Sequence, residues 1–378
     1  MECWFKDTKM IKLSKPYIPS SSFELIEQVI QSGNLVQGEQ VLAFENKLSK
    51  YLDIEHVIVV SSGTAALHLA LLALGIKAND EVIVPAYSFP AVANAVEMTG
   101  ASCCFVDISL DDYCMDTKQL ESKINKNTKA IMPVHEFGQA ADIVPIMTLA
   151  EKYNLHVIED AACAIGTKYN NQFTGTFGDM GCFSFHPRKI LTTGEGGAIT
   201  TRDKTLADRL RQLRNHGIQS TEGKIDFVLP GYNYRMTDFQ ASMGLSQLEE
   251  INTTINIHKE QASLYHKAFN QIQEIHIDST FENRFQTYQT YHIIFESGQI
   301  RDFVKKELYQ MGVESNIGAY SIPAQSYFHN KYNVSKLDYT YADIAYKRGL
   351  ALPVGRHLNE KDIHFISTSV IKLVQDGL

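Results

Sequence analysis

A lysine and a serine five residues before it stand out among the residues that can do chemistry. Lys189 ends the stretch FSFHPRK, and Ser184 lies within it between Phe183 and Phe185. A lysine amine attacks a carbonyl group when burial and neighbouring groups keep part of it neutral, and the two phenylalanines offer such dry surroundings. The serine hydroxyl can bind a phosphate of the same ligand. Taken alone, Lys189 is more simply interpreted as a surface lysine, because lysines are mostly exposed.

Two further polar segments follow apolar strand patterns. Asp160 stands beside Glu159 at the end of HVIED, and ligand sites of open α/β sheets gather at the carboxyl ends of strands. The segment SSGT, residues 61–64, follows HVIVV and opens a helical pattern, where N–H groups and the helix dipole favour a phosphate. Both have a simpler interpretation, because Asp160 can cap a helix over AACAIG and Ser62 or Thr64 can cap the next helix.

The composition excludes several classes of protein. The chain has 378 residues, 44% hydrophobic and 21% charged, which indicates a globular protein of two or three lobes. Its formal net charge of −8 offers no basic field, so we expect no nucleic-acid partner and no membrane partner. Six cysteines without CxxC pairs favour a reducing compartment, and MECWFKDTKM lacks the pattern of a signal peptide. We therefore predict a cytoplasmic protein, and we predict no metal site.

The elements that must position the candidate residues alternate along the first two thirds of the chain. Runs such as HVIVV, EVIVPAYSF and SCCFVDI are separated by helical patterns such as AALHLALLAL and IVPIMTLAEKY. This alternation predicts an α/β fold with a mostly parallel central sheet covered by helices. The apolar window from His56 to Ile76 is interrupted by SSGT, which indicates strand, turn and helix instead of a membrane span.

The pattern changes after Gly231. A long helical stretch runs from about Asp238 to Ile272, and the remainder mixes strand candidates such as TYHIIFE with helices such as RDFVKKELYQMG. We therefore predict a large domain over residues 1–250, in which residues 1–10 form a loose terminus. A smaller C-terminal α/β domain is predicted over residues 251–378. Because no low-complexity linker separates them, we expect the two domains to pack together.

A strand-end aspartate, a phosphate site at a helix start and a downstream Ser-x-x-x-x-Lys are together the parts that pyridoxal 5'-phosphate (PLP) requires. The chain also carries, in this order, the motifs SSGTAAL, PAYSFPAVANAV, PVHEFGQ, IEDAACAIG, FSFHPRK, TGEGGAI and GYNYRMTDFQAS. These motifs resemble those of the DegT/DnrJ/EryC1/StrS family of PLP-dependent sugar aminotransferases. The resemblance extends from IKLSKPYI to ALPVGRHL and implies a PLP-dependent transferase of fold type I, similar to aspartate aminotransferase. A nicotinamide dehydrogenase lacks support, because no glycine fingerprint follows the first strand.

The resemblance implies a role for each candidate catalytic residue. Lys189 would form the internal aldimine with PLP and then carry protons between the cofactor carbon and the substrate carbon. Asp160 would hold the pyridine nitrogen protonated, so that the ring accepts electrons. Phe89, in PAYSFP, would stack on the pyridine face, and a phenylalanine of the core is the alternative.

The resemblance also implies how the phosphate is bound and how subunits assemble. Gly63, Thr64 and Ser184 match phosphate-binding positions of the family. Asn233, in GYNYRMTD, matches the asparagine that reaches the phosphate from the neighbouring subunit. This match implies a homodimer with shared active sites.

Several positions depart from the family pattern. Cys163 takes the place of the Gln or His that often hydrogen-bonds near the cofactor ring, and a thiol is a weaker partner. Asn34 replaces the frequent Trp of the SGxLxQG turn, and Glu136 stands where a hydrophobic residue is usual. The segment Ser315–Phe328 lacks the usual histidine-bearing pattern and has Gly318 near that place. We expect these positions to bear on substrate specificity.

The sequence therefore predicts an aminotransferase that moves an amino group from an amino acid, expected to be L-glutamate, to a keto sugar. The expected acceptor is a nucleotide-linked 3- or 4-keto-deoxysugar, which would serve the biosynthesis of deoxyamino sugars for polysaccharides. A keto-inositol or another cyclic ketone is an alternative acceptor, and a non-catalytic PLP-binding sensor is an alternative function. Lys189 argues against the relatives that carry histidine there and dehydrate the sugar.

Overall fold

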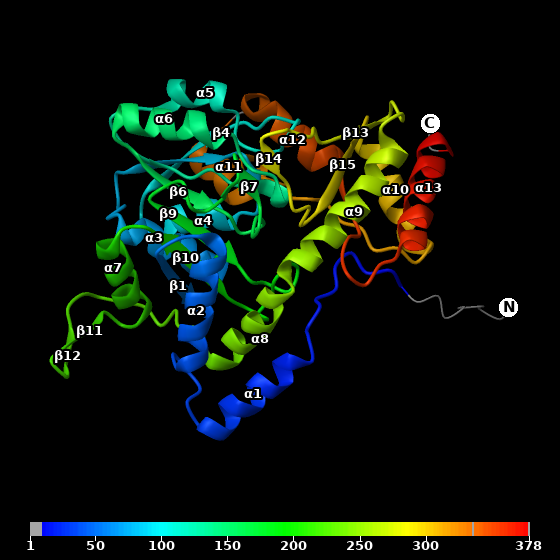
Figure 1. Cartoon of the computed structure of the whole chain (residues 1–378). Coiled ribbons are helices and arrows are strands. Elements are labelled where there is room, and N and C mark those ends of the chain that lie inside the picture. The colour runs from blue at the N-terminus through cyan, green and yellow to red at the C-terminus, as the bar shows by residue number, and fades with distance from the viewer. Residues whose placement is uncertain (1–9, 335, 377–378) are drawn as a thin grey trace.

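The computed structural model, which describes residues 10–334 and 336–376, is built around a central sheet of seven strands in the order β1-β10-β9-β6-β5-β2-β4 (Figure 1). These strands are β1 (His56–Val60), β2 (Glu81–Pro85), β4 (Ser102–Val106), β5 (Thr128–Ile131), β6 (His156–Asp160), β9 (Met180–Ser184) and β10 (Gly197–Thr201). Most of their side chains are buried, as expected for a sheet covered on both faces.

Strand direction places one long loop at a particular edge of the sheet. β10 runs antiparallel to both of its neighbours, β1 and β9, whereas the other pairs are parallel. Six of the seven strands therefore point the same way, and the predicted mostly parallel sheet is confirmed. An antiparallel pair needs no crossover helix. The connection between Ser184 and Gly197 is accordingly a loop, and it carries Lys189 at the edge where the parallel strands have their carboxyl ends.

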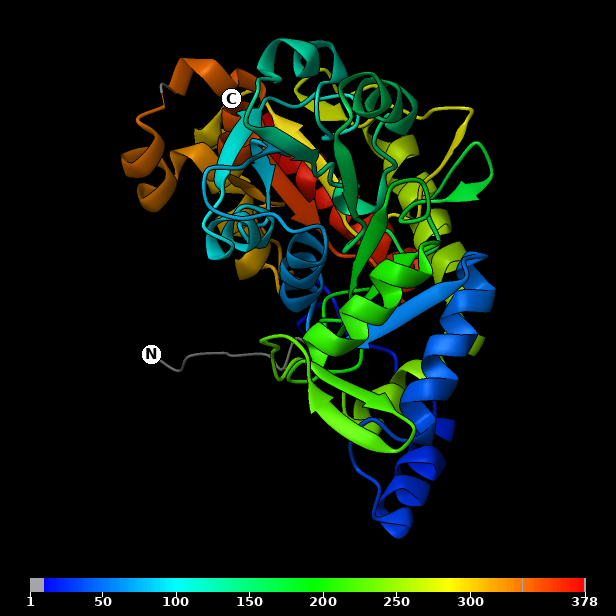
Figure 2. The ribbon, with the colours of Figure 1, turned by 90° about the vertical axis from the view of Figure 1, so that its left-hand side faces the viewer.

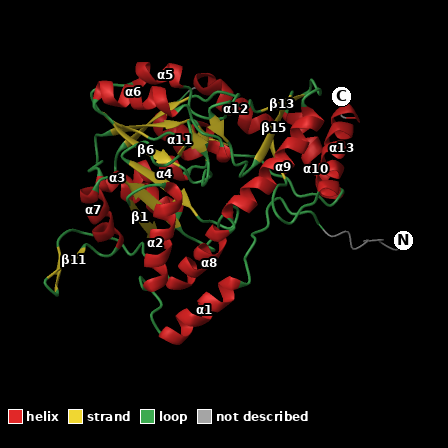
Figure 3. Cartoon of the chain, in the orientation of Figure 1, coloured by secondary structure: helices red, strands yellow, loops and turns green. Residues whose placement is uncertain are grey.

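Helices cover both faces of the sheet (Figure 3). They include α3 (Gly63–Ala73), α4 (Ala91–Met98), α5 (Thr117–Lys123), α6 (Ile143–Tyr153) and α7 (Lys204–Arg214). Successive side chains of a strand point to opposite faces. Val82 and Val84 accordingly share a hydrophobic cluster with residues of α3 and α4, whereas Ile83 joins the cluster that contains Leu120 of α5 and Ile146 of α6.

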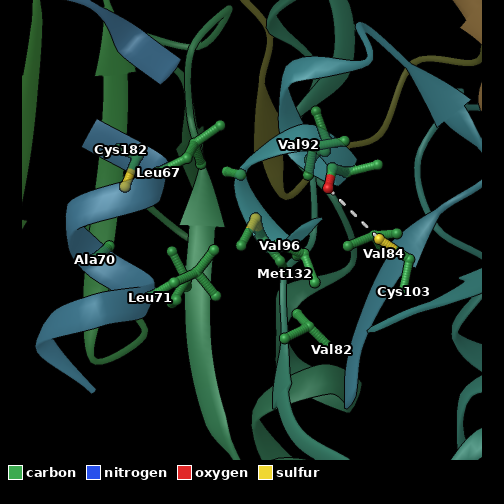
Figure 4. Close-up of a cluster of buried hydrophobic side chains, with 14 of the residues drawn as sticks. Leu67, Ala70, Leu71, Val82, Val84, Val92, Val96, Cys103, Met132 and Cys182 are labelled. Carbon is green, nitrogen blue, oxygen red and sulfur yellow. Dashed lines mark hydrogen bonds between the residues drawn. The ribbon is translucent and has the colours of Figure 1, made fainter. Parts of the chain in front are cut away.

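Helix α3 is apolar on nearly all sides and is buried between the sheet and its neighbours. It packs against β9, β10, α4 and α7. Figure 4 shows Leu67, Ala70 and Leu71 of α3 in the same cluster as Cys182 of β9. The predicted strand, turn and helix over residues 56–76 are thereby confirmed. Since burial fixes α3 on the sheet, it also fixes the position of its N-terminus at the carboxyl edge.

A second group of helices packs beside β1. α2 (Glu39–Leu52) packs against β1 and α8 (Asp238–Glu249), and α1 (Ser21–Ser32) packs against α8. Figures 1 and 2 show α1 at one extremity of the molecule and the hairpin of β11 (Ile218–Thr221) and β12 (Lys224–Phe227) projecting from the body. Both projections expose large apolar side chains in the single chain, including Phe23, which is 70% exposed, and Ile225, which is 67% exposed.

The C-terminal part forms a smaller layer of strands and helices. Its sheet has the order β13-β15-β17, and its elements are α9 (Ile251–Phe269), β13 (Ile275–Ile277), β15 (Tyr291–Phe295), α10 (Gly298–Gln310), β17 (Gly349–Leu352) and α13 (Glu360–Asp376). The helical stretch predicted from about Asp238 to Ile272 is confirmed as two consecutive helices, α8 and α9, which meet at Glu250 and end at Phe269. The strands and helices of the C-terminal part share a hydrophobic cluster of their own, which contains Tyr265, Tyr291 and Ile366.

The predicted division into residues 1–250 and 251–378 stays a prediction. Its boundary coincides with the junction of α8 and α9, but Phe328 and Ala342 pack into the cluster of the large sheet. Of the predicted loose terminus, residues 1–9 lie outside the described residues. Ile11 is held in place, because its N–H donates to the Gly312 carbonyl at 2.8 Å.

Short elements complete the structure. They are β3 (Tyr87–Ser88), β7 (Lys168–Tyr169), β8 (Gln172–Phe173), β14 (Arg284–Phe285), β16 (Tyr320–Ser321), α11 (Ser326–Tyr332), α12 (Thr340–Arg348) and the 3-10 turns Glu136–Gly138, Ile322–Ala324 and Lys336–Tyr339. Within residues 10–334 and 336–376, no helix combines the length and the apolar character needed to cross a bilayer. The cytoplasmic location stays a prediction.

Candidate active site

A cavity of about 390 Å³ opens at the carboxyl edge of the sheet. β6 ends there at Asp160, β9 ends there at Ser184, and α3 begins beside them at Gly63. Open α/β sheets bind ligands at this edge. Of the eight residues predicted to form the cofactor site, all except Asn233 line the cavity, namely Gly63, Thr64, Phe89, Asp160, Cys163, Ser184 and Lys189.

Lys189 lies in the loop between β9 and β10. Its N–H donates to the His186 carbonyl at 2.9 Å, and its Nζ donates to Sγ of Cys163, also at 2.9 Å. The side chain lines the cavity, so the interpretation as a surface lysine is wrong. Phe183 and Phe185 are buried in the hydrophobic cluster below the loop. The surroundings of the amine are therefore set by polar groups, contrary to the predicted aromatic setting.

The charge of Lys189 also differs from the prediction. Burial lowers the pKa of the amine, but Cys163 and the carboxyl groups of Glu136 and Asp160 raise it, and the pKa lies above the ordinary value of a lysine. Burial raises the pKa of the Cys163 thiol, which therefore stays neutral near pH 7. Cys163, Glu136 and Asp160 therefore favour the protonated amine, in contrast to the partly neutral amine that the sequence analysis expected.

Asp160 is buried at the end of β6, with 5% of its surface exposed. Its Oδ1 accepts from the N–H of Ala162 at 3.0 Å, and burial raises the pKa of the carboxyl group while Ala162, Lys189 and His135 oppose the rise. The predicted helix over AACAIG is wrong, because residues 161–167 form turns. Gly166 has a φ of 87°, which ends any helical path there. Asp160 therefore stabilises a turn and still lines the cavity.

Two distant segments meet to form an anion site. Ser62 caps α3, and its side chain accepts from the N–H of Ala65 at 3.1 Å. The N–H groups of Gly63 and Thr64 have no acceptor within the described part of the chain, as is usual in the first turn of a helix. A Cβ on Gly63 would lie 2.7 Å from Cβ of Ser184, so glycine permits the close approach of the serine. The capping and phosphate interpretations of SSGT are therefore compatible.

Phe89 lies on the surface of the cavity and is 66% exposed in the single chain. Its ring meets the ring of Tyr320 edge to face, with the centroids 6.2 Å apart. The alternative of a core phenylalanine is therefore wrong. Because most of the ring is uncovered, it can stack on a planar ligand in the cavity.

The positions that depart from the family pattern lie in different places. Cys163, Glu136 and Gly318 line the cavity. A Cβ on Gly318 would lie 2.5 Å from the rings of His292 and Phe137, so a larger residue does not fit there without rearrangement. Asn34 is exposed after the C-terminus of α1, where its N–H donates to Oγ of Ser32 at 3.1 Å.

Asn233 lies apart from the cavity of its own chain. It is exposed in the segment before α8 and forms an isolated bridge with Asn215. The next residue, Tyr234, accepts from the N–H of Ser61 at 2.8 Å, so the segment is anchored beside the strand that leads to α3. The predicted contact of Asn233 with a neighbouring subunit stays a prediction.

A buried network that the sequence analysis missed supports the strand ends. Nδ1 of His135 accepts from the N–H of Ala141 at 3.0 Å, so Nε2 carries the proton and donates to Glu159 at 2.9 Å. Glu159 also accepts from the N–H groups of Gly175 and Phe177 at 2.8 Å and 2.7 Å. The adjacency of Glu159 to the strand-end aspartate was the signal available in the sequence. The network fixes the segments that carry Glu136 and Asp160.

The fold and the cavity define an α/β enzyme in which a lysine and an aspartate meet beside a helix N-terminus, as PLP-dependent transferases require. The chain belongs to the DegT/DnrJ/EryC1/StrS aminotransferase family, whose model matches residues 16–371. The predicted family, fold type I, cofactor PLP and transaminase class are thereby confirmed.

Known proteins resemble the chain over almost its whole length. It is 36% identical over 369 residues to the GDP-perosamine synthase of Escherichia coli O157:H7, which covers 97% of this chain and 100% of that protein. It is 31% identical over 376 residues to a UDP-4-amino-4,6-dideoxy-N-acetyl-beta-L-altrosamine transaminase of Campylobacter jejuni, with 97% and 98% covered. The PLP-form of the putative sugar aminotransferase Spr1654 from Streptococcus pneumoniae matches with a TM-score of 0.92 and 27% identity, with 98% and 100% covered.

The residues of the cavity fit PLP in their chemistry. The free N–H groups of α3 and the hydroxyl of Ser184 suit a phosphate, because a helix N-terminus attracts anions. The Asp160 carboxyl group suits a protonated ring nitrogen, and the Lys189 amine suits a carbonyl carbon. The uncovered ring of Phe89 suits the flat face of the cofactor.

Proposed function

We propose that the protein transfers an amino group from an amino acid, expected to be L-glutamate, to a nucleotide-linked keto sugar. The observation that carries the proposal is the meeting of Lys189 and Asp160 in one cavity at the N-terminus of α3. The names of both relatives refer to nucleotide-linked amino sugars, one with GDP and one with UDP. The two names agree on a nucleotide-linked sugar, which supports this class of acceptor. They differ in the nucleotide, so they do not assign the nucleotide of the acceptor proposed here. The ring carbon, expected to be C3 or C4, also stays a prediction.

The proposed roles follow from the position of each group. When bound, PLP supplies an electron-accepting ring that stabilises negative charge on the substrate carbon. Lys189 would hold the cofactor covalently between turnovers and would move a proton to and from that carbon, for which its amine must first lose a proton. Asp160 would pair with the ring nitrogen and keep that nitrogen protonated. Phe89 would cover one face of the ring and exclude water from it.

The phosphate would be held by the N–H groups of Gly63 and Thr64 and by the hydroxyl of Ser184. Charge-assisted hydrogen bonds of this kind are stronger than neutral ones and fix orientation as well as affinity. The Cys163 thiol contacts Lys189 and is a weak partner for the oxygen of the cofactor ring. We therefore propose that Cys163 lines the site and contributes little to the affinity for the cofactor.

We further propose a homodimer in which Asn233 completes the phosphate site of the partner. Large apolar side chains are exposed on α1, including Phe23 and Ile30, and on the β11–β12 hairpin, including Ile225 and Phe227. Exposed apolar patches of this kind mark protein interfaces. Asn233 lies next to this hairpin in sequence and is itself exposed, which supports its use by a second copy of the chain.

A subunit-mixing experiment tests the shared site. Lys189→Ala and Asn233→Ala homodimers are each expected to be nearly inactive, because each lacks one group at both sites. Heterodimers assembled from the two variants should regain up to about half of the wild-type activity per dimer, because one of the two sites then receives both native residues. Activity is measured on heterodimers isolated with two different affinity tags. Confirmed heterodimers that are as inactive as the two variant homodimers would contradict the shared site. Dimers that combine a Lys189→Ala subunit with a Lys204→Ala subunit serve as the control.

The proposed reaction is tested by its two halves. L-glutamate alone should remove the visible absorbance of the lysine-bound cofactor, and the correct keto sugar should then restore it, as ping-pong kinetics requires. GDP-linked and UDP-linked keto sugars are compared with a keto-inositol as acceptors, and NMR locates the new amino group in the product. If only the keto-inositol restores the visible absorbance, the proposed nucleotide-linked acceptor is wrong. A spectrum unmoved by glutamate but moved by another amino acid would replace the donor.

A further inference from the structure

Glu136 is a buried carboxyl group in the cavity that the proposed function leaves without a role. It opens the 3-10 turn Glu136–Gly138, directly after His135 of the buried network. Its side chain is 4% exposed and lines the cavity. Phe137, the next residue, has a φ of 56°, in the left-handed region that residues other than glycine rarely adopt. Packing around the turn therefore keeps Glu136 in place against local backbone preference.

One oxygen of this carboxyl group lacks a partner. Oε2 of Glu136 is buried and makes no hydrogen bond within residues 10–334 and 336–376. The neighbouring Ser88 hydroxyl and Phe137 N–H lower the pKa of the group, but they do not offset its burial. Buried polar atoms in folded proteins are nearly always paired, and an unpaired one calls for an explanation. Oε2 itself is closed to solvent, whereas the residue lines the cavity, so Glu136 acts on a group that enters the cavity through the charge of its carboxylate.

Glu136 and Lys189 act on each other through charge. Burial raises the pKa of Glu136 to about 7, and the positive charge of Lys189 opposes the rise. In turn, the Glu136 carboxylate raises the pKa of Lys189, together with Asp160. The charge of Asp160 also raises the pKa of Glu136. Cys163, Cys114 and Tyr87 are neutral near pH 7, since burial raises the pKa of each of them.

Asp160 and Glu136 are not equivalent partners of Lys189. In the proposed site, the charge of Asp160 is committed to the ring nitrogen of PLP, and the thiol of Cys163 is a weak hydrogen-bond acceptor. Glu136 is then the carboxylate left to balance a positive charge on the lysine nitrogen. An opposite charge within a few ångströms favours the protonated form of such a nitrogen, and low polarity in a closed cavity strengthens the effect.

We propose that Glu136 is a positioning residue whose carboxylate charge, in the same cavity as Lys189, holds the proton on the nitrogen of Lys189 when the cofactor is attached. The inference rests on the proposed attachment of PLP to Lys189. The protonated nitrogen makes the attached carbon a better electrophile, so Glu136 extends toward higher pH the range in which the enzyme accepts an amino donor.

A spectral pH titration of the loaded enzyme tests this role without measuring activity. The visible band of the lysine-bound cofactor changes when its nitrogen loses the proton, and the midpoint of that change is the measured quantity. Glu136→Gln should lower the midpoint by roughly 1 to 3 pH units, because it removes a nearby opposite charge. Glu136→Leu should do the same, and Glu136→Asp should move the midpoint less. Glu195→Gln is the matched control, because it neutralises an exposed carboxyl group lining the same cavity.

The outcomes separate this inference from the proposed function. A wild-type protein that shows no band of a lysine-bound cofactor would overturn the proposed role of Lys189. A wild-type band with an unchanged midpoint in Glu136→Gln and Glu136→Leu would overturn the role of Glu136. Folded Glu136→Gln and Glu136→Leu proteins that bind no cofactor would also contradict a role confined to charge. Equal shifts in Glu136→Gln and Glu195→Gln would show a general effect of net charge and count against the proposal.

Discussion

Replacement of Lys189 by alanine is expected to abolish both turnover and the covalent attachment of the cofactor. The amine carries the proton to and from the substrate carbon, and general acid-base catalysis contributes roughly 10²–10⁴-fold to a rate. Loss of the covalent link removes a second contribution, so kcat should fall by at least about 10⁴-fold. Steady-state rates and the absorption spectrum of the purified variant measure the two effects.

The structure supplies controls for this substitution. Among the residues that the structure describes, the side chain of Lys189 hydrogen-bonds to Cys163 alone, so its removal should leave the fold intact and the unfolding temperature close to that of the wild type. Lys189→Arg keeps the positive charge but cannot form the covalent link, and it should be as inactive as the alanine variant. Lys204→Ala, which alters an exposed lysine paired with Asp208, should behave as the wild type. An active Lys189→Ala enzyme would refute the proposed mechanism.

Asp160→Asn is expected to have the next largest effect. The asparagine amide oxygen can still accept from the N–H of Ala162, so the turn after β6 should survive. The negative charge that holds the ring nitrogen protonated is lost, however, and the ring becomes a poorer acceptor of electrons. Removal of one such electrostatic interaction lowers kcat by roughly 10²–10³-fold. Covalent attachment to Lys189 should persist, which distinguishes this variant from Lys189→Ala in the absorption spectrum.

A cofactor analogue sharpens the test of Asp160. PLP methylated at the ring nitrogen carries a permanent positive charge and needs no carboxylate to keep it. Loading Asp160→Asn with this analogue should therefore restore part of the lost activity. Asp116→Asn, at the half-buried N-cap of α5, serves as the control for a general effect of charge removal. If the analogue leaves Asp160→Asn as slow as before, the carboxylate has a role other than charge stabilisation.

The sequence was sufficient for the elements with strong periodicity. The run HVIVVSSGTAALHLALLALG specifies a buried strand, a cap and an apolar helix, and the structure places each of them as expected. Prediction from local sequence alone failed at AACAIG. Asp160 and Gly166 favour turns there, although the residues between them include good helix formers. The reversal of β10 within the mostly parallel sheet also escaped prediction, because it depends on the pairing of β10 with both β1 and β9.

The candidate site was predictable only in combination. Lys189, Asp160 and the SSGT turn each had a simpler interpretation, and their common order with the family motifs decided between them. The charge state of Lys189 was not predictable, because it depends on carboxyl groups that the fold brings together from separate segments. Glu136 was recognised as a departure from the family pattern. Its burial and its unpaired oxygen emerged only from the three-dimensional packing of the turn.

Chemical trapping of the cofactor tests the central claim most directly. The purified protein is loaded with PLP, reduced with borohydride so that the covalent link becomes permanent, and digested for mass spectrometry. We expect a single modified lysine, Lys189, on the peptide that contains FSFHPRK, and no modification when glutamate is added before the reduction. A cofactor found on another lysine, or no modified lysine in a protein that binds PLP, would contradict the assignment of this cavity as the active site.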